Sequence, residues 1–340
     1  MQVFDQQERA RAQTVRLLLL FAVTVFGLVA SINLALALVW RVVAPGSDAY
    51  PAYFFSVNTG ITLLFVFGGW WIETSALGGG GEKLARRAGA REARPSVSEP
   101  EQKFCNIVSE LAVAASMKPP LAMVLNRVDR INAFACGWDE DDAVIAVTRG
   151  ALDYLTRDEL QGLVAHEFSH IREGDTRLNM RLAGMVFGLE LIFNLGSSMC
   201  DADDDGNRSF LALPGFAIKA AGSLGWLAGR ALKAAVSRQR EYLADARAVQ
   251  FTRSKDGLGG VLRKIAGEQK AGVGGALQEF HPSVHHMLLA DSKPQTRWLD
   301  THPPLFERIR RIYGRPMPAM PAQRDDGTAA RSTPFSEHGW

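Results

Sequence analysis

Two long uncharged stretches near the N-terminus decide what this 340-residue chain can fold into: residues 17–40 and 52–72 contain no charged side chain. A helix needs about 20 apolar residues to cross the hydrocarbon core of a bilayer. Both stretches are therefore predicted to span a membrane, as a hairpin over residues 17–72. A cleaved signal peptide is the alternative for the first stretch, but the apolar core of a signal peptide is only about 7–15 residues long.

Basic residues flank the ends of this hairpin. Three arginines precede the first stretch within residues 1–16, five lysines and arginines follow the second within residues 83–94, and the connecting loop carries only Arg41. The positive-inside rule then makes residues 1–16 a cytoplasmic tail and places the chain after the hairpin in the cytoplasm. The formal net charge of +2 gives no basic field for nucleic acid, so no nucleic-acid partner is expected.

The rest of the chain divides into a linker, a soluble domain and a tail. Residues 73–100 are rich in glycine and arginine, which predicts a flexible basic linker near the lipid surface. Patterning typical of a folded domain covers residues 101–313. Residues 314–340 are rich in proline and polar side chains, which predicts disorder.

An apolar hairpin is inserted in that domain at residues 182–229. Its two arms, 182–200 and 211–229, are candidate third and fourth spans, and each carries one charge, Glu190 and Lys219. We expect these two charges to pair if the arms cross the bilayer. The acidic loop 201–209 between the arms and the C-terminal tail have no role that the sequence assigns.

The soluble domain combines short strands with longer helices. Strand-like runs occur at Leu121–Val128, Ile131–Trp138 and Ala143–Thr148. Thr156 and Glu159 form the pattern of a capping box, which predicts the start of an amphipathic helix. The sequence therefore predicts an α+β domain, mainly helical, with a small β-sheet and N-terminal transmembrane helices.

The predicted helix carries the pattern HExxH at residues 166–170. His166 and His170, four positions apart, share one face of a helix and can bind the same metal ion. Glu167 is rotated by about a hundred degrees from His166, which places its carboxylate beside the metal rather than in the ligand set. This arrangement is typical of zinc sites in which the glutamate acts as general base.

A catalytic zinc needs a third protein ligand. The pattern that would supply a nearby histidine is absent, because Glu173 and Thr176 occupy its positions. Glu241 is the leading candidate, with Asp245 one turn later on the same helical face, where it can accept a hydrogen bond from a ligand imidazole. Four histidines compete with Glu241 for the third position: His281, His285, His286 and His302.

Several motifs in order resemble the HtpX-like membrane zinc metalloproteases, which are related to the CAAX prenyl proteases. The motifs are "INAFACG", "AVIAVTRGALDYLTRDELQGLVAHEFSHIREGD", "SRQREYLADARAV" and "THPPLFERIRRI", within residues 85–313. The resemblance implies a zincin-like gluzincin domain in a multi-pass protein of a bacterial-type inner or plasma membrane, with the catalytic domain facing the cytoplasm. CAAX proteases have more spans than the four at most expected here, which disfavours prenyl processing.

The resemblance also implies roles for individual residues. It makes His166, His170 and Glu241 the ligands of one Zn²⁺ per chain, Glu167 the general base and Asp245 the hydrogen-bond partner of a ligand. His302 and Arg308 resemble groups that stabilise the oxyanion. The edge strand that receives an extended substrate is represented by Asn132, Ala133, Phe134 and Ala135.

The function expected from these features is zinc-dependent hydrolysis of peptide bonds, and the resemblance implies damaged or misfolded membrane proteins as substrates. The partners implied are polypeptide substrates and the lipid bilayer. The alternative is a membrane scaffold or chaperone that keeps zinc for stability alone. Glu167 separates the two, because a structural zinc site is usually closed by four ligands and has no use for a base. The sequence predicts neither the natural substrate nor the oligomeric state.

Overall fold

The computed structural model describes residues 2–47, 49–201, 211–271, 287–289 and 302–323. Three competing histidines, His281, His285 and His286, lie outside the described residues, as do nearly all of the acidic loop and the end of the tail. The chain divides into two units. The first, here called the bundle, comprises residues 1–80, 177–239 and 295–301, and the second, the sheet unit, comprises residues 81–176, 240–294 and 302–340.

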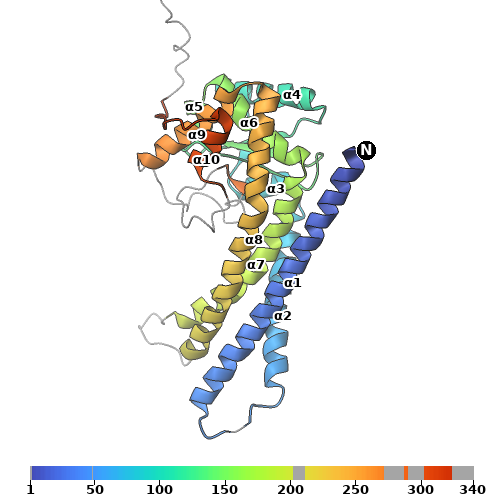
Figure 1. Cartoon of the computed structure of the whole chain (residues 1–340), viewed down its shortest axis with the longest axis vertical. Coiled ribbons are helices and arrows are strands. Elements are labelled where there is room, and N and C mark those ends of the chain that lie inside the picture. Colours follow the sequence, from blue (N-terminus) through green and yellow to red (C-terminus); the bar gives the residue numbers. More distant parts are fainter. Residues whose placement is uncertain (1, 48, 202–210, 272–286, 290–301, 324–340) are drawn as a thin grey trace, which may run out of the picture. The chain divides into compact units, whose positions relative to one another are not determined.

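Long helices make up the bundle: α1 (Gln2–Val43), α2 (Phe54–Leu77), most of α7 (Asp175–Cys200) and the first part of α8 (Ala212–Thr252). They run alongside one another in Figure 1. Among the described residues, three helices are long and apolar enough to cross a membrane, over Leu18–Val43, Phe54–Leu77 and Asp175–Cys200. The arm at 211–229 is not among them, so a fourth span stays a prediction. Helix α1 also continues through the predicted tail, because residues 2–26 contain neither glycine nor proline.

Glycines set the contact between α2 and α7. A Cβ atom at Gly188 would collide with the Val66 carbonyl, and one at Gly69 would lie 3.0 Å from the Gly188 Cα. Apolar side chains from all four helices fill the space around this contact, including Leu28, Val66 and Leu189. Small residues at helix crossings are typical of membrane bundles, where close backbone approach replaces the hydrophobic effect as the driving force.

The expected pairing of Glu190 with Lys219 is wrong. The Lys219 ammonium lies 5.7 Å from the centre of the Phe193 ring, and no ion pair joins it to Glu190 among the described residues. The cause is the register of α7 against α8: a Cβ at Gly196 would meet the Lys219 backbone. Lys219 therefore lies more than a helical turn away from Glu190.

A four-stranded sheet forms the base of the sheet unit. Its strands are β1 (Arg91–Glu92), β2 (Leu121–Leu125), β3 (Ala133–Cys136) and β4 (Val144–Thr148), in the order β1-β2-β4-β3. Strand β2 is parallel to β4, whereas β1 and β3 pair antiparallel with their neighbours. Strand β3 therefore lies at an edge, as expected for the motif "NAFACG".

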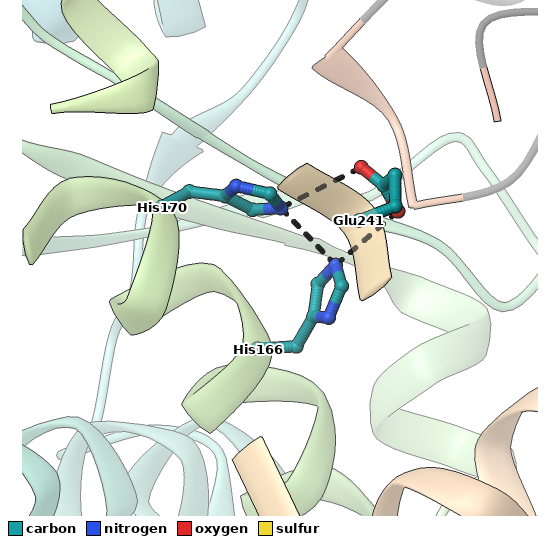
Figure 2. Close-up of side chains that lie close together, drawn as sticks. All are labelled: His166, His170 and Glu241. Carbon is teal, nitrogen blue, oxygen red and sulfur yellow. Dashed lines mark hydrogen bonds and ion pairs between the residues drawn. The ribbon is translucent and has the colours of Figure 1, made fainter. Parts of the chain in front are cut away.

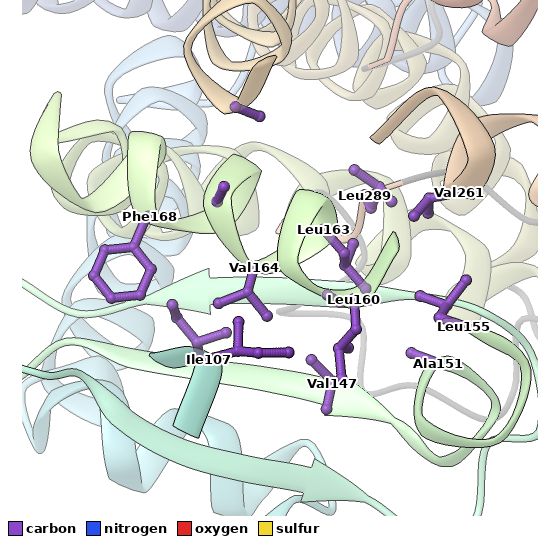
Figure 3. Packing of buried hydrophobic residues seen from close by; sticks show 14 of the residues in the cluster. Ile107, Val147, Ala151, Leu155, Leu160, Leu163, Val164, Phe168, Val261 and Leu289 are labelled. Carbon is purple, nitrogen blue, oxygen red and sulfur yellow. The ribbon is translucent and has the colours of Figure 1, made fainter. Parts of the chain in front are cut away.

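Helix α6 (Arg157–Arg172) packs on this sheet. Its apolar residues Leu160, Val164 and Phe168 lie in one cluster with Ile107 of α4 (Glu99–Ala115) and Val147 of β4, as Figure 3 shows. The remaining helices of the unit are α3 (Gly80–Arg87), α5 (Arg149–Tyr154), α9 (Lys255–Lys270) and α10 (Leu305–Tyr313). The observed fold confirms the predicted class, mainly helical with a small sheet.

Two stretches expected to be flexible contain ordered structure. The basic linker at 73–100 includes α3 and β1, because β1 pairs with β2 and Arg91 binds Glu101 through two hydrogen bonds of 2.9 and 2.7 Å. After α10, the described residues of the tail lie along α9. There the Met320 N–H donates to the Arg263 carbonyl at 2.9 Å, and Arg263 Nε donates to the Pro318 carbonyl at 2.8 Å.

Helix α9 meets a different neighbour at each of four glycines. A Cβ at Gly257 would lie 2.8 Å from the Asp158 carbonyl of α6, and Gly162 of α6 in turn faces Gly257 and Leu258. The other three contacts are Gly259 with Tyr313, Gly260 with the Glu159 side chain and Gly267 with Met320. The two helices can therefore approach closely only because neither has a side chain at this crossing.

Gly162→Ala should destabilise the protein by about 1–3 kcal/mol, because the added methyl group overlaps the α9 backbone at a packed crossing. The measurement is the thermal unfolding midpoint of the full chain in detergent, which should fall by several degrees. The matched control is Gly60→Ala in α2, where a Cβ meets nothing within 4 Å. Equal midpoints for the two variants would contradict the proposed close contact of α6 with α9.

Candidate metal centre

The N-terminus of α6, the helix that carries the motif, is capped and hydrogen-bonded to α9. The Thr156 hydroxyl accepts the Glu159 N–H, and the Glu159 carboxylate accepts the Thr156 N–H at 2.9 Å, which completes the predicted capping box. The same carboxylate accepts a 2.6 Å hydrogen bond from Lys264 of α9. These contacts satisfy donors at the start of α6 and fix the helix against α9.

About two and three turns further along α6, His166 and His170 meet a side chain of α8. The Nε2 atoms of His166 and His170 lie 3.2 Å apart, and each lies 3.6 Å from one carboxylate oxygen of Glu241 in α8. One ligand atom from each residue lies within 4.8 Å of the others. Figure 2 shows both imidazole rings directed toward the carboxylate. The structure thus brings together the three residues expected as metal ligands.

The spacing of these atoms fits a metal ion. Zinc bound at about 2.0–2.2 Å by nitrogen and oxygen in a tetrahedral site holds its donor atoms roughly 3.4 Å apart. The two imidazole nitrogens lie 3.2 Å apart, and each lies 3.6 Å from a different oxygen of Glu241, so every one of these donor pairs is near that value. Glu241 Oε2 is buried and already faces a cation, because Arg308 Nη1 lies 3.2 Å from it. The fit to a metal therefore rests on the donor set, since two imidazoles and one carboxylate are ligands that zinc accepts.

Each ligand imidazole faces a second carboxylate with its other nitrogen. His166 Nδ1 lies 3.1 Å from Asp245 Oδ1, as the sequence suggested. His170 Nδ1 lies 2.9 Å from Asp175 Oδ2, and Arg240 holds the other oxygen of Asp175. Such partners orient the imidazole and fix which nitrogen is left for the metal.

Asp175 was missed in the sequence. It begins α7, immediately after Gly174, whose φ of 71° turns the chain back toward the end of α6. The sequence did contain a signal for Asp175, which directly follows the glycine that ends the motif helix. A turn at that glycine returns the chain to the last turn of the helix, where His170 lies.

Arg308 lies behind the ligand carboxylate. Its guanidinium is fully buried and donates to Asp245 through Nε at 2.9 Å and Nη2 at 2.7 Å, and Nη1 lies 3.2 Å from Glu241 Oε2. Nη1 also donates to the Leu289 carbonyl at 3.0 Å. Burial lowers the pKa of Arg308, but Asp245 and Glu241 raise it by more, so the side chain stays charged. These contacts are those of a positioning residue for the two carboxylates.

His302 lies beside the ligand set rather than within it. Its Nδ1 is 3.4 Å from Glu241 Oε2, and the side chain is buried just before α10. Burial favours the neutral form of Glu241, but the positive charges of His302 and Arg308 outweigh this effect and lower the Glu241 pKa well below its usual value. Glu241 is therefore held as an anion, the form that binds a metal.

Glu167 is buried at the same site but belongs to no ligand group. It is 2% exposed, and it makes no hydrogen bond or ion pair with any residue that the structure describes. Burial raises the pKa of Glu167 to about 7, and the charge of Glu241 adds to the rise. A carboxylate with a pKa near neutrality can both accept and return a proton at physiological pH.

Part of the outer side of the edge strand β3 is already hydrogen-bonded within the protein. The Asn132 Oδ1 atom accepts hydrogen bonds from the N–H groups of Ala133, at 3.0 Å, and Leu289, at 2.9 Å. The Ala133 carbonyl also accepts from Leu289 at 2.9 Å. Because backbone groups alternate between the two sides of a strand, Ala135 directs its N–H and carbonyl to the same outer edge as Ala133, whereas Phe134 pairs with β4.

A protein-family model described as peptidase family M48 matches residues 98–315 of the chain. The chain belongs to peptidase family M48. Among its relatives, a protein named Protease HtpX homolog from Ligilactobacillus salivarius is 35% identical over 217 residues, which cover 61% of this chain and 71% of the relative. One of the same name from Caldanaerobacter subterraneus subsp. tengcongensis is 33% identical over 228 residues, covering 63% and 73%.

A third relative with this name, from Listeria welshimeri, is 29% identical over 274 residues, which cover 74% of this chain and 86% of the relative. No solved structure matches the chain. Family membership and the candidate spans make this M48 peptidase a membrane metalloprotease. The resemblance inferred from the sequence motifs is thereby confirmed.

Asp175→Asn should weaken zinc binding by about tenfold to a hundredfold, because the variant no longer presents a carboxylate to His170 Nδ1. The measurement is the zinc dissociation constant of the full chain, obtained by competition with a chelator. The control is Glu173→Gln, two residues earlier, whose carboxylate binds Arg247 outside the ligand set. Similar constants for both variants would rule out a role for Asp175 in metal binding.

Proposed function

We propose that this M48 peptidase is a zinc-dependent endopeptidase that hydrolyses peptide bonds of membrane proteins, with Glu167 as general base. The observation that carries the proposal is the convergence of His166, His170 and Glu241 within 4.8 Å, with the unpaired, buried Glu167 on the same helix turn. Two imidazoles and one carboxylate are a donor set that zinc uses in catalytic sites, which keep one coordination position open.

The alternative of a scaffold with structural zinc is less consistent with this geometry. Structural sites are closed by four protein ligands, mostly cysteines. The group found among the described residues has three members and contains no cysteine. A buried Glu167 without a protein partner would lower stability in a purely structural site, whereas an enzyme uses it.

In the proposed mechanism, bound zinc supplies Lewis-acid chemistry that makes a water molecule nucleophilic near neutral pH. Glu167 accepts the proton of the attacking water and later returns it to the leaving amine. His302, which lies on the Glu241 side of the site, stabilises the negative charge that develops on the substrate carbonyl oxygen. Arg308 acts on Glu241 and Asp245, which it holds in place as anions.

The substrate is proposed to add as an extended strand to the outer edge of β3. Ala135 provides a backbone N–H and carbonyl for this pairing. Because such hydrogen bonds involve only the main chain of the substrate, substrates with many different side chains can bind in this way. Asn132 and the Ala133 carbonyl are already bound to Leu289, so they support the edge rather than contact the substrate. Such a site suits unfolded segments, which are free to become extended.

The spans support a membrane location for the substrates. The basic residues that flank the first two spans favour an orientation with the sheet unit in the cytoplasm. A peptidase held at the membrane meets the cytoplasmic loops and tails of other membrane proteins at high local concentration. Damaged or misfolded members of that class are the proposed substrates.

Glu167→Gln should keep its zinc and lose hydrolysis by about a hundredfold or more, because the amide cannot accept the proton of water. Zinc content by elemental analysis and cleavage of casein by the detergent-purified chain test the two halves separately. Treatment of the wild type with a chelator should abolish cleavage, and added zinc should restore it. Undiminished cleavage by the variant would remove Glu167 from the mechanism.

Glu241→Ala should lower zinc occupancy, because it removes one of three ligand side chains. The expected result is a zinc content well below one per chain after dialysis against buffer. In the presence of excess zinc, the thermal unfolding midpoint of the variant should equal that of the wild type. His302→Ala is the comparison variant, and it should retain its zinc. The reverse pattern would make His302 the third ligand.

A further inference from the structure

A cavity of about 580 Å³ lies within the bundle, between α1, α2 and Met185 of α7. Its lining is aliphatic or aromatic except for Thr59 and the thioether of Met185. The volume is in the range of sites that bind small organic molecules. All three helices meet the length and hydropathy of membrane spans, so hydrocarbon rather than water is the medium that reaches this cavity.

The length of the cavity matches one leaflet of a bilayer. On α1 the lining runs from Leu18 to Val29, and on α2 from Thr59 to Trp70. Each distance is about 16 Å at a rise of about 1.5 Å per residue. Half of a hydrocarbon core of about 30 Å is roughly 15 Å, which is the depth that one lipid acyl chain occupies.

The side chains around the cavity suit a flexible chain better than another helix. Helix contacts inside the bundle are made by glycines such as Gly69 and Gly188, which let two backbones approach. The cavity is lined instead by large side chains, among them Phe21, Phe67 and Trp70. A helix would be held away by these rings, whereas a narrow hydrocarbon chain can lie between them.

A positive charge lies beyond one end of the cavity. Helices α2 and α7 run antiparallel, with Gly184 against Trp70 and Gly188 against Val66. Arg181, which is not a lining residue, precedes Met185 by one turn on the same face of α7. It therefore lies beyond the Trp70 end of the cavity, about level with the last turn of α2. Its side chain is exposed and forms no ion pair with any described residue. Tryptophan and arginine are the residues that meet lipid headgroups at a membrane surface.

We propose that this cavity binds one acyl chain of an anionic glycerophospholipid, with the lipid phosphate beside Arg181. The acyl chain fills the space between α1 and α2 along a single leaflet. The headgroup lies at the Leu18 and Trp70 end, next to the basic residues that flank the spans. This site is distinct from the metal centre and does not depend on the proposed reaction.

The test is native mass spectrometry of the full chain, delipidated in detergent and titrated with dioleoyl phosphatidylglycerol or dioleoyl phosphatidylcholine. Ala22→Trp fills the cavity from α1, because Ala22 is a small, exposed lining residue. Val23→Trp is the matched control, since Val23 is 69% exposed and faces away from the cavity. Ala22→Leu is a smaller filling variant, which keeps the test decisive if the tryptophan variant does not fold.

We expect the wild type and Val23→Trp to retain one phosphatidylglycerol. Retention should fall at least tenfold in Ala22→Trp and by a smaller factor in Ala22→Leu. Arg181→Gln should still bind lipid but lose the preference for phosphatidylglycerol over phosphatidylcholine. Equal retention by the wild type and both Ala22 variants would overturn the acyl-chain site. A wild type without headgroup preference would overturn the contact with Arg181.

Discussion

One buried guanidinium contacts both carboxylates behind the metal centre and, together with His302, keeps them charged. Glu241 and Asp245 are both buried, and burial alone would raise the pKa of each carboxyl group and favour the neutral acids. His302 and Arg308 lower the pKa of Glu241, with His302 the larger influence, and Arg308 lowers the pKa of Asp245. As a result, Arg308 of α10 stabilises two carboxylates of α8 as anions: Glu241, a predicted metal ligand, and Asp245, which faces His166.

Arg308 also ties the metal ligands to the strand where a substrate is proposed to bind. It donates to the Leu289 carbonyl, and the Leu289 N–H in turn binds Asn132 and Ala133 at the beginning of β3. A chain of hydrogen bonds therefore runs from Asp245 through Arg308 and Leu289 to the sheet edge, and an ion pair joins Arg308 to Glu241. Rigid support of this kind keeps reacting groups within the small tolerances that catalysis demands.

The local features of this protein were the most predictable. The capping box, His166 and His170 follow from residue types at helical spacing, and β3 was expected at an edge. Asp175, Leu289 and the register of α7 against α8 were not foreseen, because each depends on how distant segments pack. The strand β1 within the predicted linker was not foreseen for the same reason, because it depends on pairing with β2. The contact of Met320 with α9 likewise joins segments far apart in the chain, and disorder of the tail beyond residue 323 stays a prediction.

The four glycines of α9 affect how the sheet unit can fold. Each glycine lowers helix propensity by about 1 kcal/mol relative to alanine, so this segment is a poor helix in isolation. Its neighbours on α6, α10 and the residues after α10 occupy the space that side chains would fill. Helix α9 must therefore form cooperatively with segments that precede it and segments that follow it in the chain.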